Sequence, residues 1–234
     1  MSSNISNDIS ANTSGSNVST VSITLSHAAD AFVLGIASVN VSTGILSMTV
    51  AGTAMTQLST VVNTSGTHTA YYLFRAGNGS NEVVALNLGA ARIMTFEALS
   101  FVGTASTTPF VEGITTATGT GKTTAAASLT VSAGTANRRI IQTVGGFANA
   151  SNVISLTLGA SQTNILTGTT AIGSSVLANA NYIDAQTATV MSATCTFITN
   201  NRGVIKEIGF AILPPPPLAA TRIFQQPQPV IYYV

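Results

Sequence analysis

The stretch "STVSITL", residues 19–25, alternates apolar Val21, Ile23 and Leu25 with serine and threonine. Neighbouring side chains on a strand point to opposite faces, so this period of two predicts a strand with one buried face. The same period recurs in "ILSMTV", residues 45–50, and "EVVALNL", residues 82–88. Helical spacing is not sustained anywhere, and β-branched residues are abundant. The chain is therefore expected to be all-β.

Further short runs of this kind follow along the chain, separated by turn residues such as "AGNGSN" and "SAGTAN". They cover residues 31–39, 70–75, 93–103, 127–132, 138–148, 153–158, 176–183, 190–198 and 203–213. Short strands at regular spacing predict an antiparallel two-sheet β-sandwich of the jelly-roll or concanavalin-like kind.

Composition divides the chain into three zones. Residues 1–18 are rich in Ser and Asn and lack periodicity, which predicts a flexible leader. Residues 19–213 carry the predicted strands and are expected to form one sandwich domain. The alternative is two small sandwiches divided near residues 112–122. Residues 214–234 form the last zone.

This last zone, "PPPPLAATRIFQQPQPVIYYV", predicts an extended arm. Consecutive prolines fix φ and remove backbone donors, so they favour a stiff polyproline II spacer. The segment beyond them is too apolar for a free tail, and we expect it to dock on a neighbouring subunit by strand addition. The alternatives are docking on its own domain and a disordered end. The predicted partner-binding residues are Pro214, Pro215, Pro216, Pro217, Ile223, Phe224, Val230, Ile231, Tyr232 and Tyr233.

Charge is scarce: only 6% of the residues are charged and the net charge is +1. A neutral, hydroxyl-rich surface provides little repulsion between copies, which favours association into a homo-oligomer. It also lacks the basic stripe that nucleic-acid binding requires. No apolar run approaches the roughly 18 to 20 residues that span a bilayer, so no membrane partner is expected.

The stretch "TTATGTGKTT", residues 115–124, resembles the end of a nucleotide-binding P-loop. Gly121, Lys122 and Thr123 fit that motif, but Thr116 occupies the position of its first glycine. The motif also needs a following helix, whereas the sequence after it alternates like a strand. We therefore expect an exposed connection between strands and no nucleotide or other cofactor.

Groups able to carry catalysis are few, and we expect no enzymatic activity. Neither His27 nor His68 has metal-ligand spacing to other ligands beyond His27 with Asp30, so no metal site is expected. Glu97 lies among core-like residues and must find a partner if it is buried, for which Arg75 or Arg92 are candidates. Cys195 alternates with polar residues and is expected to be a buried, inert thiol.

Several segments, taken in order, resemble a β-sandwich module that recurs in tailed-phage structural proteins and in bacterial surface proteins. The most specific is the last, in which Ser-Phe-x-Gly is followed by Thr-Thr-Pro. Two departures are Tyr71-Tyr72, where a tryptophan is usual, and Ala51-Gly52 in place of a double glycine. The resembling segments are "AFVLGIASV" (31–39), "MTVAGTAMTQL" (48–58), "TAYYLFRAGNGSNEVVALNL" (69–88) and "ALSFVGTASTTPF" (98–110).

The resemblance implies a setting on the outside of a virion or cell and transfers no catalytic residue. The leading expectation is a decoration or cement protein on the outer surface of a phage head, made in the host cytoplasm. Its partners would be the major capsid protein and neighbouring copies of itself. The alternative is a tail, fibre or bacterial surface adhesion module that binds host glycans, for which Tyr71, Tyr72 and Tyr182 would provide a stacking platform.

Overall fold

The computed structural model describes residues 5–42, 47–76, 79–107, 110–132, 138–148, 153–165, 176–185, 188–197 and 203–215. All regular structure in these ranges is β-strand, so the prediction of an all-β, sandwich-like fold is confirmed. The strands form three antiparallel sheets rather than two. In chain order they are β1 (Ser6–His27), β2 (Ala31–Val39), β3 (Ser47–Val50), β4 (Thr53–Ala54), β5 (Thr56–Asn63), β6 (Gly66–Arg75), β7 (Ser80–Val102), β8 (Val111–Gly121), β9 (Thr124–Val131), β10 (Arg138–Ala148), β11 (Val153–Leu158), β12 (Thr163–Asn164), β13 (Val176–Ala185), β14 (Thr189–Phe197) and β15 (Gly203–Ile212).

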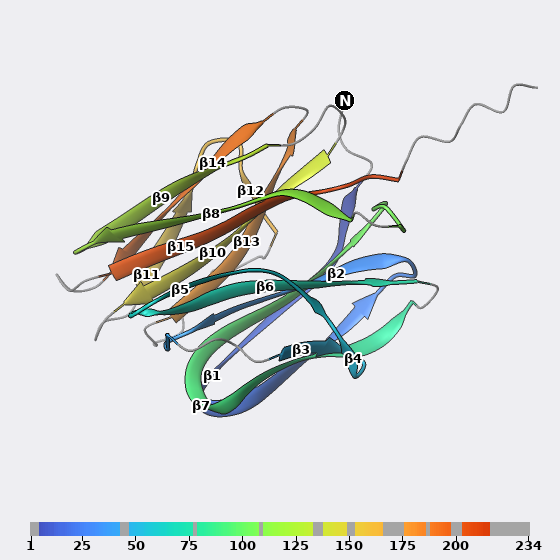
Figure 1. Cartoon of the computed structure of the whole chain (residues 1–234), viewed down its shortest axis with the longest axis horizontal. Coiled ribbons are helices and arrows are strands. Elements are labelled where there is room, and N and C mark those ends of the chain that lie inside the picture. Colours follow the sequence, from blue (N-terminus) through green and yellow to red (C-terminus); the bar gives the residue numbers. More distant parts are fainter. Residues whose placement is uncertain are drawn as a thin grey trace, which may run out of the picture.

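The first sheet has seven strands and is built around the long pair β1 and β7. The first half of β7 pairs with β3, whereas its second half pairs with β2, which continues to β6 and β5. Between these halves β7 passes Gly89, whose φ is +67°, and the register with β1 shifts at Gly15 and Val18. The pair bends at this point, and the sheet folds over on itself (Figure 1).

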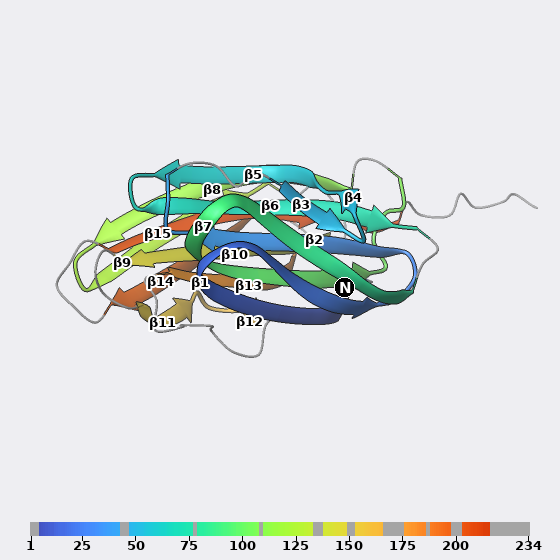
Figure 2. The same ribbon diagram turned by 90° about the horizontal axis from the view of Figure 1, so that it is seen from below.

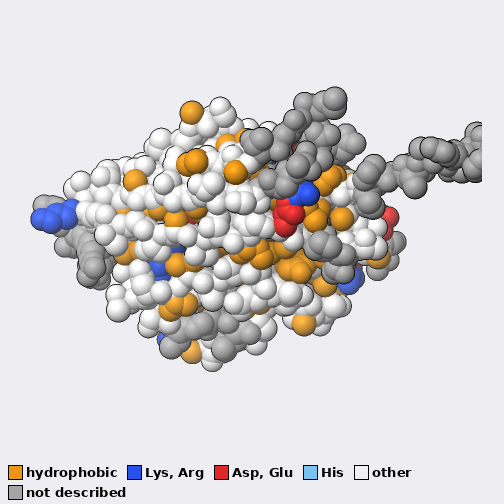
Figure 3. All heavy atoms as spheres, turned by 45° about the horizontal axis from the view of Figure 1, so that its top comes forward, with side chains coloured by type: hydrophobic (Ala, Val, Ile, Leu, Met, Phe, Trp, Pro, Cys, Tyr) orange, Lys and Arg blue, Asp and Glu red, His pale blue; other side chains and the backbone are white. Residues whose placement is uncertain are grey.

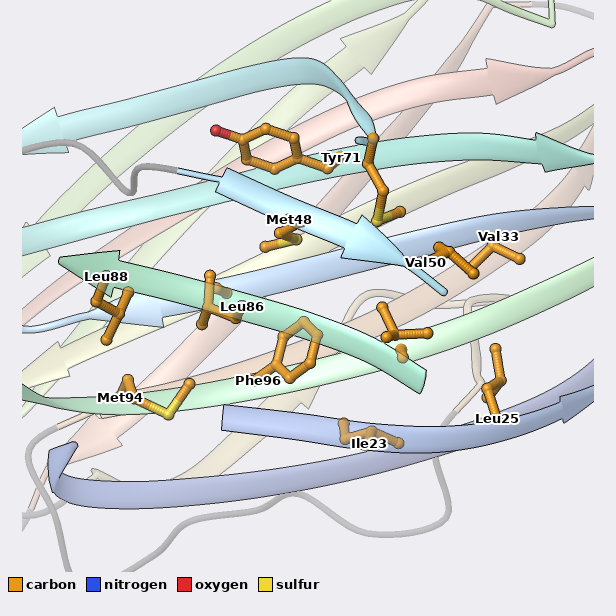
Figure 4. Packing of buried hydrophobic residues seen from close by; sticks show 14 of the residues in the cluster. Ile23, Leu25, Val33, Met48, Val50, Tyr71, Leu86, Leu88, Met94 and Phe96 are labelled. Carbon is orange, nitrogen blue, oxygen red and sulfur yellow. The ribbon is translucent and has the colours of Figure 1, made fainter. Parts of the chain in front are cut away.

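The fold-over encloses the interior core of the first half. Alternate residues of the bent pair, including Ile23, Leu25, Val84 and Leu86, are buried there. Met48 and Val50 of β3 lie beside them in the same half of the sheet, and Phe96 and residues of β2 belong to the same core (Figure 4). The period of two in residues 19–25 and 82–88 therefore arises because one face of each strand is turned toward this core.

The second half of the chain repeats this arrangement. Its five-stranded sheet runs β12-β13-β10-β15-β8 and its three-stranded sheet runs β11-β14-β9. In the first half, the order β5-β6-β2 continues to the second half of β7 and then to the first half of β1, which matches the five-stranded sheet. β3 pairs with the first half of β7, which pairs with the second half of β1, and this order matches the three-stranded sheet. Each bent strand of the first half thus corresponds to two separate strands in the second. The described part of the chain therefore contains two structural repeats, β1–β7 and β8–β15.

Pairing registers align individual residues of the repeats. When Ala37 of β2, which pairs with Phe96, is aligned with Gly146 of β10, which pairs with Ile205, "FEALSF" (96–101) corresponds to "IKEIGF" (205–210). Phe101 then matches Phe210, and both lie in one core cluster. The outer strand of each repeat also carries a register shift at nearly the same place, opposite residues 99–101 and 209–211.

The two repeats pack face to face through that cluster. Residues of β2 and β7, such as Phe32 and Leu99, meet residues of β10, β13 and β15, such as Ile141 and Ile208. Figure 2 shows the two repeats one behind the other, with β5 and β8 along the same edge. β2 is buried along its entire length because one face lies in the interior core and the other lies between the repeats.

Two boundaries differ from the sequence-based expectation. β1 begins at Ser6, so residues 6–18 are part of a strand and not a flexible leader. These residues pair with the second half of β7. Main-chain hydrogen bonds can hold such a strand in place without apolar side chains. Residues 112–121, where we considered a division into two sandwiches, lie within β8, and the repeats are joined by residues 103–110.

Candidate interaction surface

Several titratable groups with strongly shifted pKa values lie inside the fold. His68 is fully buried between the repeats, where Nδ1 forms a hydrogen bond with Ser38 Oγ at 2.9 Å and Nε2 forms one with Thr143 Oγ1 at 2.8 Å. Burial, followed by the charge of Lys206, lowers the pKa of His68 to about 3, so the ring is neutral. Both ring nitrogens are engaged and no face is open to a substrate.

Lys206 lies beside this histidine and is also fully buried. Its ammonium donates to the carbonyl oxygen of Gly66 and lies 4.5 Å from the centre of the Phe147 ring. Burial lowers the pKa of Lys206 to about 8. A side chain at Gly66 would come within 2.5 Å of Phe147, so the close approach of the repeats requires glycine there.

Glu97 corresponds to Lys206 in the alignment of the repeats and is also fully buried. Its carboxylate has no hydrogen-bond partner among the described residues, and burial raises the pKa of Glu97 to about 8. The partners we expected are engaged elsewhere: Arg75 binds Glu82, and Arg92 donates to the carbonyl of Ala91. The prediction of an ion pair for Glu97 is therefore wrong for the described part of the chain.

His27 is engaged by a residue distant in sequence. Its Nε2 lies 2.8 Å from Glu82 Oε2, and its Nδ1 lies 2.8 Å from the carbonyl oxygen of Ala28. The Arg75 hydrogen bond is the main reason that the pKa of Glu82 is lowered. This cluster ties the end of β1 to β6 and the start of β7. Over the described residues there is no group of three or more His, Cys, Asp or Glu side chains that could hold a metal ion.

Cys195 and a set of amide side chains line the interior of the second repeat. Cys195 is buried, as predicted, and burial raises the pKa of its thiol to about 12. Gln162 donates to the side-chain oxygens of Gln142 and Asn181, both at 2.7 Å, and accepts from the Ser192 N–H at 3.0 Å. This network fixes the loop before β12 against β10, β13 and β14.

The three tyrosines considered as a stacking platform lie in different places. Tyr71 is buried in the first repeat and donates to Gln57 Oε1 at 3.0 Å. Tyr72 stacks on Phe32 with ring centres 5.4 Å apart, and Tyr182 lies beneath the Arg139 guanidinium. These rings do not share an exposed face.

The exterior is poor in unpaired charge. Arg139 binds Asp184 at 2.9 Å, Arg138 contacts Glu112, and Arg75 contacts Glu82. Lys122 is exposed in the tight connection between β8 and β9, with a strand on each side. Figure 3 shows few charged groups on this face and a band of apolar side chains across its middle.

A set of partly buried apolar residues lies where the repeats meet, and we call it the junction seam. Phe110, from the connection between the repeats, stacks on Phe74 with ring centres 5.5 Å apart and meets the edge of Tyr72 at 6.1 Å. β5 lies close to β8 and β15 at this junction. The seam consists of Leu58, Val61, Tyr72, Phe74, Phe110 and Val111.

The C-terminal segment leaves the fold beside the seam. The N–H of Leu213 donates to the carbonyl of Phe110 at 3.0 Å, and the carbonyl of Leu213 accepts from the Ala105 N–H at 2.7 Å. Pro214 is half-buried and Pro215 is exposed. The other predicted arm residues, Pro216, Pro217, Ile223, Phe224, Val230, Ile231, Tyr232 and Tyr233, lie outside the described residues.

Comparison with known proteins gives no family model, curated protein or solved structure that matches the chain. In the described part of the chain, no helix has the length and apolar character needed to cross a bilayer.

The sequence alone indicates neither the junction seam nor the two hydrogen bonds that hold Leu213 where the C-terminal segment leaves the fold. The seam residues come from three separate segments, and nothing in any one of them indicates the others. One available signal was β5, "TQLSTVVN", which was not among the predicted strands although its Val61-Val62 pair and threonines are typical of strands.

Proposed function

We propose that this protein is a non-enzymatic structural protein of a tailed-phage virion, most specifically a decoration or cement protein on the outer surface of the head. It would bind the major capsid protein and neighbouring copies of itself, and the segment from Pro214 onward would reach across to those neighbours. The observation that carries this proposal is the exit of that segment from an anchored point, Leu213, beside an apolar surface.

Two further features support the proposal. The groups that could perform acid–base or nucleophilic chemistry, namely Glu97, Lys206, His68 and Cys195, are buried. The exterior is instead neutral and rich in hydroxyls, so each contact with a neighbour would be weak. A lattice multiplies such contacts, because binding at one site raises the effective concentration at the next.

Deleting residues 214–234 tests the proposal. We expect the truncated protein to remain folded, since every described strand and both hydrogen bonds of Leu213 are retained. We also expect it to lose binding to phage particles, measured by co-sedimentation with purified heads. Full binding by the truncated protein would contradict the proposed role of the arm.

The location on the head is tested separately by quantitative mass spectrometry of purified virions. A copy number in proportion to the capsid lattice supports decoration of the head. A copy number matching a few tail or baseplate subunits would contradict it.

A further inference from the structure

β5 is an open edge of the first sheet. The strand order ends at β5, which pairs with β6 and with no other described strand. Open edges are usually protected by charged side chains, proline or covering segments, because their free N–H and C=O groups can pair with another chain. The sequence of β5, "TQLSTVVN", contains neither charge nor proline. Its pairing with β6 has a register shift between Gln57 and Ser59, so the regular part of this edge is residues 59–63.

The two faces of β5 differ. Val61 pairs with His68, whose side chain points toward the second repeat, and Val61 packs against the core between the repeats. Val62 faces the other way and is 44% exposed. An added strand beside β5 would therefore place alternate side chains over the seam, next to Leu58 and Val61.

The C-terminal segment of the chain is apolar and nearly uncharged, like the junction seam. Beyond Pro215 it continues for 19 residues, whose apolar members include Ile223, Phe224 and Val230 and whose only charge is Arg222. From residue 218 onward, extended chain could reach on the order of 55 Å, about twice the roughly 27 Å of an eight-residue strand. Neither length nor charge opposes docking of this segment on β5.

The prolines favour docking on a second copy. The described chain ends beside Phe110, which is already one end of the seam. Four consecutive prolines would carry the chain about 12 Å away as a stiff spacer before the apolar residues begin. A segment that docked on the seam of its own copy would have to turn back over the length of this spacer. A segment that docks on a neighbouring copy can continue in the direction in which the spacer leads.

We propose that the C-terminal segment of one copy, residues 218–234, adds as a strand to β5 of a second copy and covers the junction seam. This inference deepens the proposed function and rests on it for the biological setting. It makes the contact between copies heterologous, with an arm on one side and a seam on the other, so that copies link head to tail.

Mixing two full-length variants tests whether the arm of one copy binds the seam of another. Val61→Asp places a charge in the seam, and Ile231→Asp places one in the arm. Each variant alone is expected to be monomeric by light scattering at concentrations where the wild-type protein associates, because burying the charge weakens association by roughly a hundredfold or more. Val62→Asp, on the other face of β5, is the matched control and should associate like the wild type.

An equimolar mixture of Val61→Asp and Ile231→Asp gives the deciding result. The first variant retains an intact arm and the second an intact seam, so the mixture should form one-to-one heterodimers and nothing larger. A monomeric mixture, a monomeric wild-type protein, or a Val62→Asp variant as impaired as Val61→Asp would overturn the proposal.

Val61→Thr covers the case in which Val61→Asp does not fold. Threonine retains the β-branched shape, and its hydroxyl should weaken association by roughly tenfold while the protein remains folded. Unchanged association of this variant would count against the seam. Exchange between copies without binding to phage heads would leave the inference standing and contradict only the proposed function.

Discussion

Replacing Glu97 with glutamine is expected to raise the free energy of unfolding at pH 9 by several kcal/mol, at most about 5. It should also remove a decline in stability that the wild-type protein undergoes between pH 4.5 and about 8. The measurement is urea-induced unfolding of both proteins over a series of pH values, with the difference between their free energies of unfolding plotted against pH.

The sign follows from burial. Burial raises the pKa of Glu97 from 4.5 to about 8, so the folded state binds this proton more tightly than the unfolded state. Stability is therefore fully present below pH 4.5, falls as the pH rises toward about 8, and is level above that. Glutamine has a similar shape and does not ionise. Any change that the amide itself causes in the free energy of unfolding is therefore the same at every pH.

Other buried groups titrate in the same range, and the difference plot separates them from Glu97. Burial lowers the pKa of His68 to about 3, which makes stability rise with pH between about 3 and 6.5. Burial also raises the pKa of Glu207 to about 7, partly offset by the Gln142 side chain and the Ala193 N–H. Both contributions are common to the two proteins and cancel.

Glu82→Gln is the control of opposite sign. Because the Arg75 hydrogen bond lowers the pKa of Glu82, its contribution is present above pH 4.5 and is lost as the pH falls. The Glu82 variant should therefore be less stable than the wild type at neutral pH and approach it in acid. A flat difference plot for Glu97→Gln would mean that its carboxylate is stabilised in the folded protein.

The all-β class could be predicted from sequence because half-buried strands leave a period of two. Ile23 and Leu25 on β1, like Met48 and Val50 on β3, are buried on one face with polar neighbours on the other. The boundary of β1 could not be found in this way. Its first part is held by main-chain pairing with β7, and its Ser/Asn-rich composition carries no signal of that pairing.

The repeats and the surroundings of Glu97 depend on contacts between residues distant in sequence. Phe101 and Phe210 become equivalent only through their pairing with β2 and β10, and their neighbouring sequences, "FEALSF" and "IKEIGF", share little beyond spacing. Glu97 was assigned a candidate arginine because buried carboxylates usually have one. Arg75 at the end of β6 binds Glu82 near the start of β7, and Glu97 is left without it.

Truncating Phe101 to alanine is expected to lower the stability of both repeats together. The side chain is fully buried in the core that the repeats share, and such truncations cost about 3 to 5 kcal/mol. Hydrogen exchange measured by mass spectrometry should show faster opening of β10 and β13 in the second repeat, as well as of β2 and β6 in the first. Unfolding in urea should remain a single transition.

Phe210→Ala is the reciprocal variant, and it should affect the first repeat in the same way. Val190→Ala serves as the control, because Val190 is 64% exposed and its truncation should change stability by no more than about 0.5 kcal/mol. If Phe101→Ala accelerated exchange only in β1–β7, or split unfolding into two transitions, the repeats would be independent domains.

Coupling of this kind is expected because each repeat presents one apolar face that the other must cover. Phe101 and Phe210 lie at matching positions on those faces, so neither repeat could keep its phenylalanine buried if the other unfolded. Exposing such a side chain costs roughly 1.5 to 3 kcal/mol, and the shared cluster holds many of them. A stable intermediate with one repeat unfolded would have to bear that whole cost, and we therefore expect none to accumulate.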